Sequence, residues 1–151
     1  MKNMNKKGLW TVAAVIIVLL VAGGYWFWKN SERTSTLDDG TKLVTAPEGK
    51  IVSGFPAEFL IEAAAVGESY RLDYKSGTTQ PVIVYGSAKT FEDNIAAFRK
   101  LLEDGAWAIV QEDVSEPSGF LYGVRDNEEV NVTFSMGEGR AVVVTLAYAR
   151  S

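Results

Sequence analysis

The sequence predicts an α+β protein, in which an N-terminal transmembrane helix precedes a two-layer domain. The domain is expected to be an antiparallel sheet of about five to six strands with one packed helix, in the order β-β-α-β-β-β-β. Three observations lead to this fold class. Residues 9–28 are uncharged, residues 90–104 have helical periodicity, and several later segments have apolar residues at every second position between turn residues.

The first predicted element is the transmembrane helix. Residues 9–28 read LWTVAAVIIVLLVAGGYWFW without a charge, which is long enough to cross a hydrocarbon layer of about 30 Å. Lys2, Lys6 and Lys7 precede this run, and the positive-inside rule then places the N-terminus in the cytoplasm. The sequence therefore predicts a signal-anchored, single-pass protein of a bacterial envelope, with the lipid bilayer around residues 9–28 and the C-terminal domain periplasmic or extracellular.

Two other interpretations of the N-terminus remain open. Small residues at 22–24 after an apolar run are typical of a cleaved secretory signal, whereas the aromatic residues at 25–28 are typical of an uncleaved anchor. The residues at 6–8, Lys-Lys-Gly, resemble a prepilin processing site, so a pilin-like subunit is a minor alternative. Pilins usually have a Glu five residues into the mature chain, where this sequence has Ala13.

The predicted organisation has four regions. Residues 1–8 are a cytoplasmic tail, 9–28 the transmembrane helix, 29–54 a polar tether, and 55–151 the extracytoplasmic domain. The region 29–54 is assigned as a tether because it is polar, contains turn-forming residues and shows no apolar periodicity.

Two strands are expected before the helix. Tyr70, Leu72 and Tyr74 alternate with charged residues, which indicates a half-buried strand. A turn at 76–78 leads to a second strand at about 82–85, with a proline just before it, where a missing backbone donor is tolerated.

One helix is expected at about 91–104. Thr90 followed by Asp93 resembles a capping box, and Gly105 is a natural residue to end the helix. Four apolar residues fall on one helical stripe at spacings of four, three and four: Phe91, Ile95, Phe98 and Leu102.

Four strands are expected after the helix, at about 107–114, 119–125, 130–136 and 141–149. The short turns between them predict antiparallel hairpins, and the helix should pack over the apolar face of the resulting sheet. Trp107 is expected to close the core between helix and sheet.

These elements resemble small uncharacterised extracytoplasmic α+β domains of bacterial lipoproteins and single-pass membrane proteins. The resemblance covers about residues 55–149. It is carried by Phe55, Pro56, Phe98, Gly105 and Trp107. Those domains usually have a Pro-Gly-Ala turn where this chain has three alanines at 63–65, and their Gly and Trp are adjacent, whereas one Ala separates them here. The resemblance implies the same fold and brings no known activity.

Composition excludes several classes of function. The chain has 151 residues with no Cys and no His, which removes disulfides, thiolate nucleophiles, thiol-ligated zinc and Ser-His-Asp triads. Residues after 29 carry 11 basic and 19 acidic side chains, a net charge of −8, which argues against nucleic acid as a partner. The acidic residues lack EF-hand spacing and are expected on a solvated surface, so no catalytic residue, metal or cofactor is predicted.

The remaining prediction is a protein-interaction or envelope-associated binding module that is not an enzyme; the alternative is a small carboxylate-dependent envelope hydrolase. A helix covers only one face of a sheet, so the other face meets water or a partner. If Val82, Phe120, Val142 and similar residues point at the helix, alternation turns an apolar set outward as the possible contact face for a protein partner or for self-association. This set is Ile83, Tyr85, Leu121, Val143 and Ala147. The opposing expectation is that the segment 55–66 folds across that face and buries it.

Overall fold

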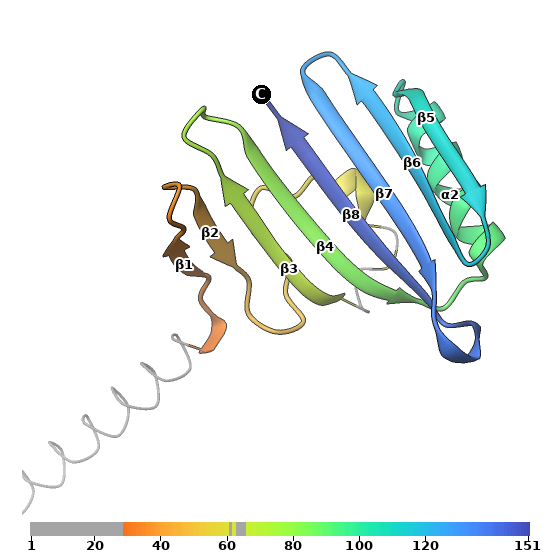
Figure 1. The fold of residues 1–151 in the computed structure, drawn as a ribbon, viewed down its shortest axis with the longest axis horizontal. Coiled ribbons are helices and arrows are strands. Elements are labelled where there is room, and N and C mark those ends of the chain that lie inside the picture. Colours follow the sequence, from red (N-terminus) through yellow and green to blue (C-terminus); the bar gives the residue numbers. More distant parts are fainter. Residues whose placement is uncertain (1–28, 61, 63–65) are drawn as a thin grey trace, which may run out of the picture. The chain divides into compact units, whose positions relative to one another are not determined.

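The structure is a computed structural model that describes residues 29–60, 62 and 66–151. Glu32–Ser151 forms one compact unit, and the fold described here lies within it. Its centre is one antiparallel sheet of eight strands in the order β1-β2-β3-β4-β8-β7-β6-β5 (Figure 1). The strands are β1 (Arg33–Thr36), β2 (Lys42–Thr45), β3 (Val66–Asp73), β4 (Thr79–Ser87), β5 (Ala108–Ser115), β6 (Ser118–Arg125), β7 (Glu128–Met136) and β8 (Val142–Arg150). The described helices are α2 (Phe91–Asp104) and the short 3₁₀ turns η1 (Ala57–Phe59) and η3 (Glu138–Arg140).

The fold class predicted from the sequence is wrong in its sheet. The protein is dominated by an eight-stranded sheet with one helix, instead of a two-layer α+β domain with five to six strands. The two extra strands, β1 and β2, lie within residues 29–54, which were predicted to be a polar tether. They carry little apolar alternation, with the sequences RTST and KLVT, because they form one edge of the sheet. β2 pairs with β3, and β1 pairs with β2. Apolar periodicity within a strand does not indicate such pairing.

The predicted membrane topology finds no counterpart in the structure. Within the ranges 29–60, 62 and 66–151, no helix is both long and apolar enough to cross a membrane. The segment predicted to span the bilayer, residues 9–28, lies outside the described residues, as do the residues behind the cleaved-signal and pilin-like alternatives. The prediction of a signal-anchored, single-pass protein with its C-terminal domain outside the cytoplasm is therefore corrected, since the described residues contain no membrane span.

The helix agrees with its sequence signals. Its stripe of Phe91, Ile95, Phe98 and Leu102 is buried, and the Thr90 side chain accepts a hydrogen bond from the Asp93 amide at 3.1 Å. At the other end, a side chain on Gly105 would collide with the Trp107 ring, and the left-handed backbone conformation falls on Ala106 instead. A glycine is therefore required at 105 for close approach and not for its own dihedral angles.

Two elements share the same face of the sheet and build the core. The helix packs on β5, β6 and β7, while the segment that precedes β3 covers the other half of that face (Figure 1). Phe59 of η1 joins the two halves, since its ring lies 5.5 Å from Trp107 and 6.1 Å from Tyr148, centroid to centroid. Trp107 is buried in the core, as the sequence predicts.

Candidate functional site

The best candidate for a binding site is the face of the sheet opposite α2, which we term the open face. Strand pairing decides which side chains share it, because residues directly opposite in an antiparallel pair point to the same side. One row of such neighbours crosses the open face from β2 to β6: Thr45, Tyr70, Val82, Ala147, Asn131 and Tyr122. The row therefore runs across six of the eight strands of the sheet.

The structure divides the predicted contact set between the two faces. Val143 and Ala147 lie on the open face, and Val143 is 40% exposed. Ile83, Tyr85 and Leu121 instead belong to the buried core beneath α2 and η1, and Leu121 is 0% exposed. The five residues therefore do not form one surface. The prediction that Ile83 and Tyr85 of β4 and Leu121 of β6 face outward is wrong. The opposing expectation, that the segment 55–66 covers these residues, holds for β4, because Phe55, Phe59 and Leu60 pack in the same core as Ile83 and Tyr85 on the helix side.

The error has a physical cause. Residues 82–85 and 120–122 are apolar or aromatic at every position, so alternation alone does not select the inward phase. Two glycines on β6 do carry that information. A side chain on Gly119 would lie 3.2 Å from the Phe91 ring, and one on Gly123 would lie 3.2 Å from Val130, so both positions face inward where neighbours approach closely. Leu121, between them, shares their face.

A groove of about 570 Å³ is the larger hollow on the open face, and we term it the β2–β3 groove. Its floor is formed by Leu43 and Leu72, which are directly opposite each other, and by Tyr70. Two acidic residues, Glu48 and Glu68, line it, and no basic residue does. The sequence gives no sign of this groove, because residue 43 lies in the segment that was predicted to be a tether.

A second hollow of about 360 Å³, the β6–β7 hollow, lies on the same face. Phe120, Asn131, Thr133 and Asp113 line it, and again no lining residue is basic. Beside it, a hydrogen bond to the Glu129 carboxylate raises the pKa of the Tyr122 hydroxyl. Phe120 was expected to point at the helix, and the structure turns it to the open face instead.

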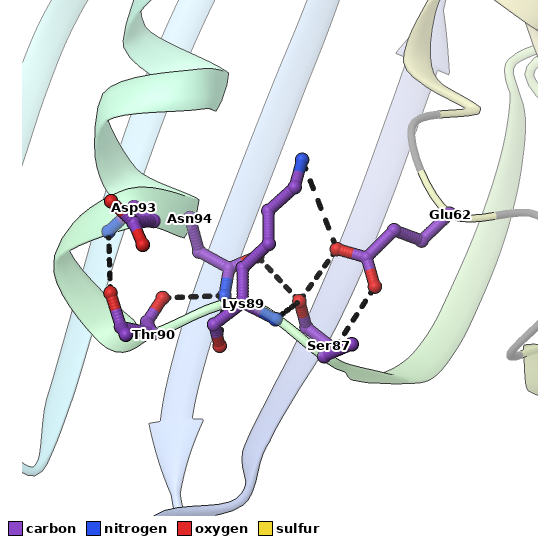
Figure 2. A network of polar contacts seen from close by, with 7 residues as sticks. Glu62, Ser87, Lys89, Thr90, Asp93 and Asn94 are labelled. Atoms are coloured by element: carbon purple, nitrogen blue, oxygen red, sulfur yellow. Dashed lines mark hydrogen bonds and ion pairs between the residues drawn. The ribbon is translucent and has the colours of Figure 1, made fainter.

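On the helix side, a polar network ties the segment before β3 to the start of α2 (Figure 2). The Ser87 hydroxyl lies 2.6 Å from Glu62 Oε1 and 2.9 Å from Asn94 Oδ1. Asn94 is almost fully buried, and its amide nitrogen donates to the carbonyl oxygens of Lys89 and Thr90. Every polar atom of the Asn94 amide thus has a partner, which identifies the network as a structural brace at the beginning of the helix.

The Ser87–Glu62 pair does not form a nucleophilic site. The other Glu62 oxygen accepts from the Ala88 amide at 3.0 Å, and Lys89 Nζ lies 4.0 Å from the carboxylate (Figure 2). The carboxylate is therefore engaged by other donors, and the pair has no imidazole to accept and return the proton.

A charged network lies at another edge of the core, around Arg125. Its guanidinium stacks over the Trp107 ring at 4.3 Å, contacts Glu58 at 3.0 Å and Glu128 at 2.8 Å, and donates to the Gly105 carbonyl. A pocket of about 460 Å³ is bordered by Arg125, Glu58, Glu128 and Tyr148. Arg125 thus joins η1, the end of α2 and β7.

Glu128, one of the two carboxylates of this pocket, does not suit the role of a general acid in hydrolysis. Hydrogen bonds from the Tyr148 hydroxyl and from Arg125 lower the pKa of Glu128, whereas a general acid in glycoside hydrolysis needs a raised pKa. Burial, followed by the hydrogen bond to Glu128, raises the pKa of Tyr148 to about 12. Glu128 is therefore ionised and Tyr148 protonated at neutral pH, which does not favour a hydrolase that uses Glu128 as its general acid.

No cluster of three or more potential metal-ligating side chains occurs in the part of the chain that the structure describes. Comparison with protein-family models, with curated proteins and with solved structures finds no match to this chain. The candidate site therefore rests on its own geometry, which is that of a binding surface with an apolar groove.

Proposed function

We propose that this domain is a protein-interaction module that binds a short segment of a partner protein in the β2–β3 groove. The observation that carries the proposal is the groove itself, with about 570 Å³ of space over Leu43, Tyr70 and Leu72 on the open face. Binding sites are commonly concave, between roughly 300 and 1,000 Å³, and lined mainly by apolar side chains with a few polar groups. The groove has this size and this composition.

The apolar floor of the groove is only partly shielded from water. Leu43, Tyr70 and Leu72 are half-buried. They do not belong to the hydrophobic core, which lies on the other face of the sheet. A ligand side chain seated in the groove would remove the remaining apolar surface from water, at about 25 cal/mol for each Å². This gain is available to a partner and does not require any rearrangement of the core.

A selection experiment tests the proposal. A random heptapeptide library displayed on phage is selected on the immobilised full-length chain, and the dissociation constants of selected peptides are measured by fluorescence anisotropy. Leu43→Ser combined with Leu72→Ser should weaken their binding at least tenfold, because each substitution removes about 1 kcal/mol or more of apolar contact. The thermal midpoint of the double variant should change by only a few degrees.

The control is Val110→Ser, which alters a side chain that is 56% exposed on edge strand β5, outside the groove. It should leave peptide binding unchanged. The proposal fails if the library yields no peptide that binds the chain, or if selected peptides bind the Leu43→Ser, Leu72→Ser variant as tightly as the wild type.

A further inference from the structure

We infer that the partner segment is basic and extended, and that it crosses the open face from the β2–β3 groove to the β6–β7 hollow. This inference rests on the proposed function and adds the chemistry of the partner and the length of chain that is bound. It is drawn from the charges on the open face, from the spacing of the two hollows and from the surface between them.

The charge of the open face is predominantly negative. Glu48 and Glu68 line the β2–β3 groove and Asp113 lines the β6–β7 hollow, while neither lining includes a basic residue. Glu129 of β7 also points to this face, whereas the basic strand residue there, Arg33, lies at the β1 edge. Charge complementarity steers association and selects partners, so a segment with Lys or Arg matches this surface.

The two hollows are spaced for one extended segment. From β3 to β6 the sheet order passes through β4, β8 and β7, which makes four interstrand spacings, or about 19 Å. An extended chain advances about 3.3 Å per residue, so roughly six residues reach from one hollow to the other. A shorter segment fills only one of them.

The surface between the hollows permits this path. Val82 and Ala147 lie next to each other in the row that joins Tyr70 to Tyr122, and Val82 is only 5% exposed. No long or charged side chain stands between the two tyrosines in that row, where Asn131 follows Ala147. The two tyrosines at its ends offer aromatic rings, which attract ammonium and guanidinium groups.

A second copy of this chain is a poor occupant. Two open faces packed together would bring two acidic surfaces into contact, because Glu68, Asp113 and Glu129 all lie on this face. Like charges brought together in an interface are unfavourable, and they act against the wrong partner. A basic segment of a different protein meets no such repulsion.

The test uses the peptides selected on the full-length chain. The selected heptapeptides should be enriched in Lys and Arg over the unselected library, and their affinity should fall as salt is raised. Glu68→Gln combined with Asp113→Asn should weaken a selected basic heptapeptide at least fivefold. The matched control, Glu103→Gln with Glu138→Gln, removes the same charge from exposed residues of α2 and η3 and should change affinity by less than twofold.

Peptide length tests the extended path. Phe120→Ser should weaken a heptapeptide at least fivefold, and should have no effect on a tetrapeptide cut from its groove-binding end. Far-UV circular dichroism checks that the variant is folded, and the charge variants test the same hollow independently.

Three results would overturn the inference while leaving the groove intact. They are selected peptides without a basic bias, equal effects of the charge variant and its control, and Phe120→Ser acting alike on long and short peptides. Sedimentation of the chain as a dimer that Leu43→Ser and Leu72→Ser disrupt would identify a second copy as the occupant instead. If peptide binding does not depend on Leu43 and Leu72, the proposed function is wrong as well.

Discussion

The inward phase of β6 can be tested with two neighbouring residues. Leu121 is buried beneath α2, whereas Phe120 is half-buried on the open face. Leu121→Ala should therefore destabilise the domain more than Phe120→Ala, although Phe120 is the larger residue. The opposite order would follow if Phe120 pointed at the helix, as alternation in the sequence suggests.

The magnitudes follow from burial. Leu121→Ala removes three carbon atoms from a site that is 0% exposed, which costs about 2.4 kcal/mol in transfer free energy. The remaining cavity raises the total to about 3 to 5 kcal/mol. Phe120 leaves no enclosed cavity, so Phe120→Ala should cost about 1 kcal/mol. The two thermal midpoints should then differ by about 10 °C, at roughly 4 °C per kcal/mol for a domain of this size.

Urea unfolding of the full-length variants, followed by far-UV circular dichroism, measures both free energies of unfolding. If the slope of the unfolding free energy against urea concentration equals that of the wild type, the variants expose the same surface on unfolding and their free energies can be compared. If Phe120→Ala proves more destabilising than Leu121→Ala, the register and facing of β6 are wrong, and the β6–β7 hollow is wrong with them.

Three further predictions concern the core and its charged edge. Phe98→Ala should cost about 3 to 5 kcal/mol in urea unfolding, because its buried ring on α2 would leave a cavity; a midpoint within two degrees of wild type would contradict the packing. Tyr85→Phe should be neutral or stabilising by about 1 kcal/mol, since its buried hydroxyl has no hydrogen-bond partner among the described residues; a clear loss of stability would reveal one. Glu128→Gln should destabilise the domain at pH 7, and the difference should shrink as pH falls below 4.5, the ordinary pKa of this group. The sign follows from the lowered pKa of Glu128 in the folded state. The ionised carboxylate stabilises the fold above pH 4.5, and this stabilisation is lost as pH falls through the folded pKa. A stability difference between variant and wild type that does not change with pH would refute this prediction.

Local signals in the sequence determine the elements that have strong periodicity. The helix begins after Thr90 and ends at Asp104, as its cap and its apolar stripe predict. Trp107 lies in the core as expected, and strands occur at the segments around 70–74 and 82–85. These elements can be predicted because helical spacing, capping residues and turn residues are determined by residues close together in the sequence.

The candidate site depended on information of another kind. Its groove needs β2 beside β3, which places Leu43 opposite Leu72 although they are far apart in the chain. The phase of β4 and β6 is set by packing against α2 and η1, because runs of consecutive apolar residues can face either way. Sequence alone therefore determined the helix and the main strands, and only the tertiary structure decided the number of strands and the residues of the open face. The physical reason is that edge pairing and inward phase arise from contacts across the sheet, which leave no periodic trace in a single strand.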